Sequence, residues 1–429
     1  MCFAHTPESN RCMAGKALCT NDLAIGKTAW KYFENNYQPK TGLVNSNDKY
    51  PSTTMWDTGS ALAATIAAHR LGIISEKDFD DRIVAVLATM NTIKLFKDVA
   101  PNKAYNAATA EMSDYANRPS DGIGYSALDI SRLVSWLKLL ECTSPKHGAA
   151  ARRVVSRWNT CEITEDGEMR GAYVDPASKR VSLVQEGRLG YEQYGGKGFS
   201  LLGIDQSVSS SYKNRYAQSV SIYGVDIPYD IRDPRKFGAY NYVVTESYTL
   251  DAIEFGIDDV NGPLLANIFE VQKRRWQDTG IVTAVSEDNV DRPPYFVYNT
   301  IYAAGTPWST ITDTGVDQDA LKATSTKAAF TLAALFPDHE YSAVLMDKIG
   351  SAYDPERGWY SGVYESGIGY NKSITANTNG IILETLLYKS IGALQRRCAK
   401  CQAKQPRVVV PGGTLAMAAP AKCPVRSAK

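Results

Sequence analysis

Residues 50–71, YPSTTMWDTGSALAATIAAHRL, decide the fold of this chain because they join an aromatic, polar loop to the clearest helical pattern in the sequence. From Trp56 to Leu71, apolar residues recur at helical spacing, which predicts a helix. The loop before it, Tyr50 to Asp57, brings aromatic rings and a carboxylate to the start of that helix. The same order of loop and helix returns along the chain, so we interpret the fold as a repeated helical unit.

Helical spacing of apolar residues predicts close to a dozen helices in total. Besides residues 56–71, the predicted helices are residues 24–37, 79–93, 127–140, 149–158, 192–202, 246–255, 264–276, 321–336, 341–349 and 378–394. Strand signals are sparse and local: residues 168–184 predict a hairpin, and residues 282–301 predict an irregular strand-like stretch. Because no regular βα alternation is present, a parallel-sheet enzyme is not expected.

Every second predicted helix follows a longer loop rich in Gly, Asp, Glu, Asn and aromatic residues. After the loop at residues 50–57, these loops are Asp121 to Tyr125, Glu186 to Glu192, Tyr242 to Tyr248, Ala304 to Trp308 and Glu365 to Asn379. Six helical hairpins in a ring need this alternation, because one end of the inner helices gathers the loops and the other end has short connections. We therefore expect an all-α (α/α)6 toroid with small β-hairpin insertions. A helical solenoid, whose long loops also fall on one face, is the alternative.

The composition favours a neutral partner. The chain has 429 residues, of which 44% are hydrophobic, so it can bury a large core. Its formal net charge of +1 argues against a nucleic-acid partner, and no apolar run is long enough for a transmembrane segment. The 25 Tyr and 7 Trp, against 11 Phe, suit a surface that binds oligo- or polysaccharide, although tyrosines in the core would give the same excess.

The eight cysteines predict an exported protein. They are Cys2, Cys12, Cys19, Cys142, Cys161, Cys398, Cys401 and Cys423. An even number with groups near both ends favours disulfides, so we expect a periplasmic or secreted protein, in which Cys142 and Cys161 can close a local loop. No signal peptide is visible after Met1, so this expectation requires that an export signal has been removed. A cytoplasmic protein with free thiols is the alternative.

The chain divides into three parts by composition. Residues 1–21 are an extension that contains cysteines, residues 22–393 are the predicted toroid and catalytic domain, and residues 394–429 are a tail rich in Cys, Pro and Ala. We expect the tail to be poorly structured unless its cysteines pair.

Several kinds of site are not expected. The four histidines, His5, His69, His147 and His339, lie far apart in the sequence and show no metal-ligand spacing, so no metal site is predicted. No GxSxG elbow supports a Ser/His/Asp triad, and neither a P-loop nor a dinucleotide fingerprint is present. We therefore predict no cofactor.

The remaining chemistry is that of carboxylates beside aromatic rings at helix starts. Glycoside hydrolysis needs one carboxylic acid to protonate the leaving oxygen and one carboxylate to activate water or attack directly. The candidates are Asp57, Asp121, Glu186, Glu192, Glu246 and Glu365. Each is also a residue type found at helix caps or on the surface, so a structural role competes with catalysis at every position. Asp129 falls inside a predicted helix, where a buried structural role is expected.

Four motifs stand out along the chain: Trp56-Asp57-Thr58-Gly59-Ser60-Ala61-Leu62 with Leu71-Gly72-Ile73-Ile74, Gly124-Tyr125-Ser126-Ala127-Leu128-Asp129, Tyr191-Glu192-Gln193-Tyr194, and Asn377-Thr378-Asn379 before Leu383-Glu384. With these motifs the sequence resembles a bacterial family, domain of unknown function 3131, over about residues 22–393. That family is similar to six-hairpin glycosidase-type domains. The resemblance implies the toroid, an envelope setting and a polysaccharide cleft, and it does not fix a catalytic pair.

We therefore predict a glycoside hydrolase of a bacterial polysaccharide, β-glucan included, with Glu192 as general acid and Asp57 as general base. The predicted substrate-binding residues are Trp56, Tyr125, Arg188, Tyr191, Tyr194, Tyr248, Trp308, Trp359, Tyr364, Asn377 and Asn379. Two alternatives stay open: a polysaccharide lyase, and a glycan-binding scaffold protein without activity.

Overall fold

A computed structural model describes residue 18, residues 20–234 and residues 240–396. The helices are α1 (Thr20–Asn35), α2 (Met55–Arg70), α3 (Glu76–Met90), α4 (Ala127–Thr143), α5 (Pro145–Ser156), α6 (Thr160–Ile163), α7 (Tyr191–Ser200), α9 (Thr245–Leu250), α10 (Asn261–Thr279), α11 (Thr326–Leu335), α12 (Glu340–Ile349) and α13 (Ala376–Ile391). Each predicted helix is present, and its ends lie within four residues of the predicted ones when the π-helical turn after α9 is included, except at the start of α11. Residues 321–325 are not helical, because Ala323–Ser325 pair as a strand and α11 begins only at Thr326.

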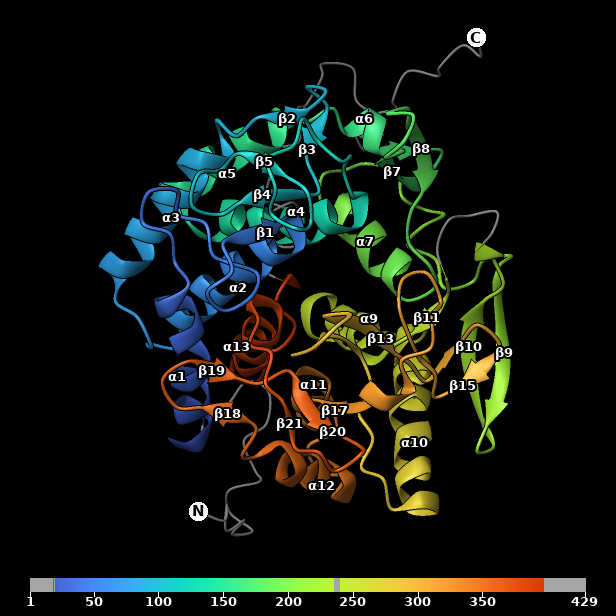
Figure 1. The fold of residues 1–429 in the computed structure, drawn as a ribbon. Coiled ribbons are helices and arrows are strands. Elements are labelled where there is room, and N and C mark those ends of the chain that lie inside the picture. Colours follow the sequence, from blue (N-terminus) through green and yellow to red (C-terminus); the bar gives the residue numbers. More distant parts are fainter. Residues whose placement is uncertain (1–17, 19, 235–239, 397–429) are drawn as a thin grey trace, which may run out of the picture.

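Six helices form a circuit in which each packs against the next. The order is α2, α4, α7, α9, α11 and α13, and α13 packs against α2 again. Figure 1 looks nearly along these helices and shows them around one centre. The π-helical turn η2 (Asp251–Phe255) continues α9 and contacts α7 and α13. These six helices are the ones that follow the long loops of the sequence.

The other helices lie outside this circuit. Helices α1, α3, α5, α10 and α12 pack against the inner helices and appear at the periphery of Figure 1. Between α7 and α9, the outer position is taken by the hairpin of β9 (Ala217–Ile222) and β10 (Val225–Asp230), and β10 packs against α10. The prediction of helical hairpins throughout therefore fails at one place, because residues 201–230 form turns and this hairpin.

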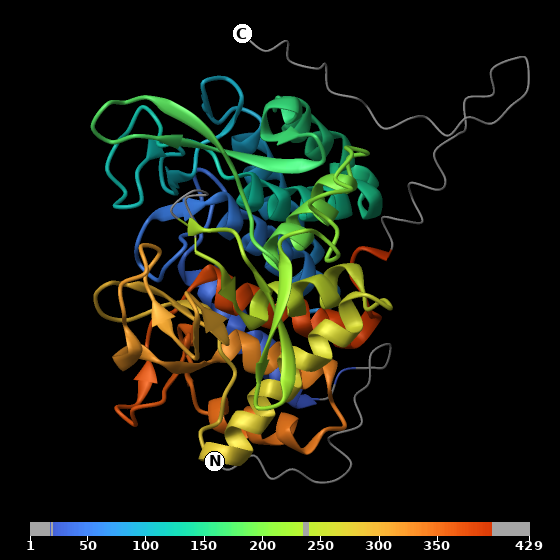
Figure 2. The same ribbon diagram turned by 90° about the vertical axis from the view of Figure 1, so that its right-hand side faces the viewer.

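Short antiparallel strands are inserted before the inner helices. The strands are β1 (Ser52–Thr54), β2 (Leu95–Phe96), β3 (Ala100–Pro101), β4 (Ala104–Asn106), β5 (Met112–Ser113), β6 (Thr164–Glu165), β7 (Glu168–Val174), β8 (Val181–Gln185), β9, β10, β11 (Tyr242–Val243), β12 (Glu287–Asn289), β13 (Phe296–Asn299), β14 (Tyr302–Ala303), β15 (Thr306–Pro307), β16 (Thr310–Ile311), β17 (Ala323–Ser325), β18 (Tyr353–Asp354), β19 (Gly358–Trp359), β20 (Gly362–Tyr364) and β21 (Tyr370–Asn371). They form small sheets such as β1-β4-β5, β12-β13-β16 and β17-β20-β21. Figure 2 shows most of these insertions on one side of the helices. The predicted hairpin at residues 168–184 is confirmed as β7 and β8.

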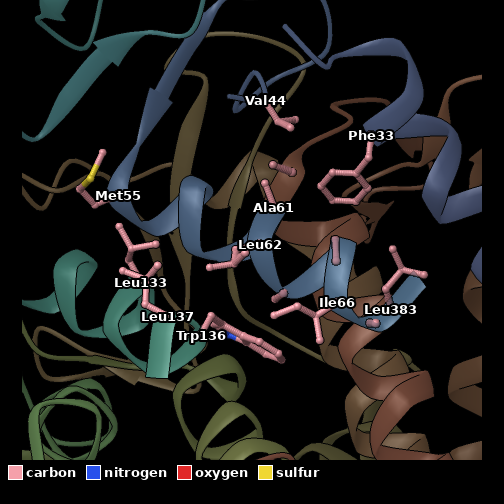
Figure 3. Close-up of a cluster of buried hydrophobic side chains, with 14 of the residues drawn as sticks. Phe33, Val44, Met55, Ala61, Leu62, Ile66, Leu133, Trp136, Leu137 and Leu383 are labelled. Carbon is pink, nitrogen blue, oxygen red and sulfur yellow. The ribbon is translucent and has the colours of Figure 1, made fainter. Parts of the chain in front are cut away.

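The core lies between the inner helices and their outer partners. Leu62 and Ile66 of α2 pack with Leu133 and Trp136 of α4, and Figure 3 shows this cluster with Phe33 of α1. Helix α2 is buried along nearly its whole length, which its run of Ala, Leu and Ile explains. Small residues let the inner helices approach closely: a Cβ added at Gly380 of α13 would lie 3.0 Å from the carbonyl oxygen of Ser60 in α2.

The disulfide predictions have two outcomes. No disulfide joins Cys142 to Cys161, so the local loop predicted between them is wrong. Helix α5 folds back along α4 after Cys142, and Cys161 then lies in α6, which contacts β6 and β7. The pairings predicted for the chain ends concern cysteines that lie outside the described residues.

Candidate functional site

A cleft of about 1230 Å³ opens at the N-terminal ends of the inner helices. First-turn residues of α2, α4, α7, α11 and α13 line it, among them Trp56, Asp129, Tyr191, Lys327 and Asn377. The strand insertions add walls to the cleft, since residues of the β5 loop, of β12 and β13, and of the turn between these two strands also line it. The loops that the sequence placed before every second helix therefore supply most of this site.

Asp57 is held at the start of α2 by a capping box. Its Oδ2 accepts hydrogen bonds from the Thr54 backbone N–H at 3.3 Å and from the Thr54 hydroxyl at 2.8 Å, while the Thr54 hydroxyl accepts from the Asp57 N–H at 3.1 Å. Both capping bonds use Oδ2, so Oδ1 is left for the cleft. Burial raises the pKa of Asp57, and the bonds from Thr54 oppose this rise.

Asp129 and Glu186 meet at the start of α4. Glu186 accepts hydrogen bonds from the backbone N–H groups of Ala127 and Leu128, the latter at 3.2 Å, so this carboxylate caps α4 from outside the helix. Burial raises the pKa of Asp129 to about 7, and the nearby charges of Glu186 and Asp57 add to the rise. Like charges at close range disfavour ionisation of neighbouring carboxyl groups, so Asp129 is partly protonated near neutral pH.

A second acidic group lies on β12. The Glu287 carboxylate accepts a hydrogen bond from the Tyr191 hydroxyl at 2.7 Å, and burial together with the charge of Glu246 raises its pKa to about 8. Burial also raises the pKa of the adjacent Asp288 to about 6, against the charge of Lys327. The cleft therefore holds carboxyl groups on two of its sides whose pKa values approach neutrality.

A chain of polar contacts lies beneath the cleft and joins α2, α13, α9 and α11. Trp56 Nε1 donates to Asn377 Oδ1 at 2.9 Å, and Asn377 Nδ2 donates to Glu246 Oε1 at 3.0 Å. Glu246 in turn pairs with Lys327, whose ammonium also lies 3.4 Å from Asp288. Glu246 is buried in this chain and does not line the cleft, which makes it a supporting residue.

Besides Glu246, three more predicted catalytic carboxylates lie away from the cleft lining. Glu192 is buried in an ion pair with Arg232, at 2.5 Å, and its Oε1 accepts from Gln185 at 3.0 Å. Glu365 pairs with Arg275 at 2.6 and 2.7 Å. Asp121 is exposed and is not part of the lining. Of the predicted acids, the structure brings Asp57 and Glu186 together in the cleft.

The predicted substrate-binding residues divide in the same way. Trp56, Arg188, Tyr191 and Asn377 line the cleft. The others do not: Tyr125, Tyr194, Tyr248, Trp359, Tyr364 and Asn379 are buried in the core, and Trp308 packs against Arg275. Tyr194, Tyr248 and Asn379 lie within inner helices, and Trp359 and Tyr364 lie in short strands, where each side chain is buried. Asn379, for example, donates to the Trp359 and Thr375 carbonyl oxygens.

Several lining residues were not predicted from the sequence. They are Lys103, Tyr115, Asp129, Tyr240, Tyr242, Glu287, Asp288, Asp291, Tyr295, Phe296, Tyr298, Asp313 and Lys327. Many of them fall in residues 282–301, which the sequence assigned only to an irregular strand. Three acidic residues within positions 287–291, followed by three aromatic residues within positions 295–298, were the signal that could have identified this wall.

The cleft lining is acidic. Its carboxyl residues are Asp57, Asp129, Glu186, Glu287, Asp288, Asp291 and Asp313, and its basic residues are Lys103, Arg188 and Lys327. This excess of carboxyl groups gives the cleft a negative electrostatic potential, which its low-dielectric walls strengthen. A negative potential disfavours an anionic ligand. Within the described residues, no group of three or more His, Cys, Asp or Glu side chains is arranged to hold a metal ion. No helix of the described chain is long and apolar enough to span a bilayer.

Solved structures share this fold. The endo-β-1,2-glucanase from Chitinophaga pinensis, solved with sophorotriose and glucose, has a TM-score of 0.62 at 13% identity, over 90% of this chain and 97% of that chain. The endo-β-1,2-glucanase from Talaromyces funiculosus with sophorose has a TM-score of 0.61 at 13% identity, over 90% and 86%. The glucoamylase from Saccharomycopsis fibuligera has a TM-score of 0.51 at 8% identity, over 94% and 99%.

A search of curated proteins finds no match to the chain. A family model described as Protein of unknown function (DUF3131) matches residues 24–392, the region over which the sequence motifs predicted this resemblance. The chain therefore belongs to this family.

Proposed function

We propose that the protein is a glycoside hydrolase that cleaves a neutral glucan in the cleft at the N-terminal ends of the inner helices. One observation carries the proposal: Asp129, whose pKa is raised to about 7, lies beside two carboxylates that accept hydrogen bonds at helix starts, Asp57 and Glu186. Carboxyl groups whose surroundings separate their pKa values are the arrangement that acid and base catalysis requires. The glucanases and glucoamylase that share the fold support the substrate class.

In this proposal Asp129 is the general acid and Asp57 is the general base. Asp129 donates its proton to the glycosidic oxygen, and Asp57 uses Oδ1 to take a proton from the attacking water. Glu186 caps the start of α4, and its charge adds to the raised pKa of Asp129. We assign the role of general acid to Asp129 and no longer to Glu192, because Glu192 is paired with Arg232 outside the cleft lining.

The acidity of the cleft supports a hydrolase of neutral sugars over a lyase. A lyase must neutralise a uronate carboxylate before a proton is removed, and the seven carboxyl residues of the lining outnumber its three basic residues. We also propose, from the cysteine pattern, that the protein itself is exported to the periplasm or secreted.

Reducing-sugar release from a panel of neutral glucans tests the proposal. We expect wild type to cleave at least one of linear β-1,2-glucan, laminarin and soluble starch, and Asp129→Asn and Asp57→Asn to lose at least about 100-fold, as expected for general acid–base groups. Glu365→Gln serves as the matched control, because this carboxylate is paired with Arg275 away from the cleft. Full activity in both cleft variants would contradict the assignment, and binding without release in wild type would favour the scaffold alternative.

We further infer that the circuit of inner helices is a closed (α/α)6 toroid in which the β9–β10 hairpin replaces one outer helix. The contacts of α13 with both α11 and α2 support this closure.

A further inference from the structure

Two tyrosines at the mouth of the cleft are exposed to solvent to an unusual degree. Tyr115 and Tyr295 each expose 62% of their surface, and both line the cleft. The exposure of an apolar aromatic ring to water is unfavourable, so two exposed rings at one cleft indicate a surface that binds a ligand. Tyrosine suits a sugar ring because it offers an apolar face and a polar edge.

The two rings come from opposite sides of the molecule. Tyr115 follows β5 in the insertion before α4, and Tyr295 precedes β13 in the insertion before α11. In the circuit of six inner helices, α4 is second and α11 is fifth, so three steps separate them in either direction. The cleft therefore has one exposed tyrosine on each of two facing walls.

The loop of Tyr115 is fixed by Asp114. Its Oδ1 accepts hydrogen bonds from the backbone N–H groups of Ala116 at 3.0 Å and Arg118 at 2.9 Å, and its Oδ2 accepts from Arg118 Nε at 2.7 Å. The surroundings of the cleft desolvate the Tyr115 hydroxyl and raise its pKa, and the charges of Asp129 and Glu186 add to this rise, which places the hydroxyl near the proposed catalytic carboxylates. A sugar against this ring would lie close to Asp129.

Tyr295 is held in a backbone conformation that side chains rarely adopt. Its φ is +70°, its N–H donates to the Arg292 carbonyl oxygen at 2.8 Å, and its own carbonyl oxygen accepts from Val290 N–H at 3.1 Å. The turn is anchored through Asp291, which accepts from the Tyr364 hydroxyl at 2.7 Å. Backbone strain that the surroundings maintain is concentrated at ligand-binding positions, and here it presents the ring to solvent.

We propose that Tyr115 and Tyr295 form an aromatic clamp that holds a neutral glucan polymer across the cleft, so that the enzyme acts on the interior of a chain. The effect of the clamp on cleavage rests on the proposed function. Its role in binding the polymer does not depend on catalysis. In this proposal a polymer contacts both rings, and a short oligosaccharide bound at Asp129 depends on them less.

Affinity electrophoresis separates binding from cleavage. Wild type, Tyr115→Ala, Tyr295→Ala and the double variant are run in native gels that contain linear β-1,2-glucan, laminarin or soluble amylose. We expect each single variant to raise the Kd for the retarding polymer about 3- to 10-fold, the range that loss of one aromatic contact implies. Tyr115→Phe and Tyr295→Phe, which keep the rings, should stay close to wild type.

Tyr223→Ala is the matched control, because Tyr223 is also exposed, has a φ of +49° and lies away from the cleft lining. Polymer binding unchanged in the double variant would overturn the clamp, and so would a wild type that no polymer retards. If polymer binding depends on both rings but no glucan is cleaved, the clamp stands and the proposed hydrolase fails. If cleavage occurs, the variants should lose activity on polymer and keep it on a trisaccharide.

Discussion

At the residue scale, Asp129 gives the clearest expectation for pH dependence. Its pKa in the folded chain, about 7, lies above its ordinary value of 3.8, so the folded chain keeps a proton that the unfolded chain has lost between these pH values. The contribution of this site to stability is therefore present at low pH and decreases as pH rises through about 7. The activity should decrease as pH rises past about 7, because the folded enzyme then loses its proton donor.

The profile of kcat/KM against pH tests this expectation. We expect the activity to fall above about pH 7, with Asp129 as the acid. A fall near pH 8 would instead assign the acid role to Glu287, whose pKa is raised to about 8. An activity that stays constant well above pH 8 would contradict both assignments.

Arg132 of α4 joins three inner helices and the π-helical turn η2 at the centre of the helical circuit, through Trp56 of α2, Glu254 of η2 and Glu384 of α13. Its guanidinium is fully buried and pairs with Glu254 at 2.8 Å and Glu384 at 2.5 Å, and it lies 4.9 Å from the centre of the Trp56 ring. Burial raises the pKa of both glutamates, and the charge of Arg132 opposes this rise. The floor of the cleft therefore rests on a buried charge network.

Arg132→Met should lower the free energy of unfolding by about 3–5 kcal/mol, the usual effect of removing one partner of a buried ion pair. Denaturant unfolding followed by circular dichroism measures it. Lys31→Met removes an exposed pair with Glu34 and should cost no more than about 1 kcal/mol. Similar losses in the two variants would show that the network adds nothing to stability.

At the scale of elements, a side-chain cap at the start of α2 and one at the start of α3 allow the stabilising role of a cap to be separated from the catalytic role proposed for Asp57. Thr54 caps α2 and holds Asp57, while Ser75 caps the outer helix α3 and bonds Asp78. Both side chains accept a backbone hydrogen bond at 3.1 Å, so the two caps are matched in geometry.

Thr54→Ala and Ser75→Ala should each cost about 1 kcal/mol of stability, because each removes one cap bond. Only Thr54→Ala should also lower kcat, since it frees the carboxylate of Asp57 to rotate away from its position. Thermal unfolding and glucan hydrolysis of the two variants provide the comparison. Equal activity in both would mean that the cap of α2 does not position a catalytic group.

At the scale of the whole molecule, the contact between the first and last inner helices decides whether the circuit is closed. Gly380 lies against Ser60, where an added Cβ would be 3.0 Å from the carbonyl oxygen and 3.2 Å from the Cβ of Ser60. Gly380→Val should therefore push α13 away from α2 and cost about 1–3 kcal/mol. Ser390→Val, at a half-buried position of the same helix, is the control and should cost less than about 1 kcal/mol. Equal unfolding free energies would argue against a tight closure.

The sequence by itself determined the helices, their alternation with long loops and the family. Helical periodicity is local, so α2, α4 and α13 were predicted nearly to their ends from the spacing of apolar residues. The loops before the inner helices also identified Trp56, Asp57, Glu186, Arg188, Tyr191 and Asn377 as cleft residues.

Only the tertiary structure decided which loop side chains face the cleft and which face the core. Glu192 and Glu186 are six residues apart in one loop and helix start, yet Glu192 pairs with Arg232 while Glu186 caps α4 beside Asp129. The direction of a side chain and the charge of its neighbours come from segments far away in the chain. The pKa of Asp129 is raised by burial and by the charges of Glu186 and Asp57 from two other segments, so no local pattern could have identified it as the proposed acid.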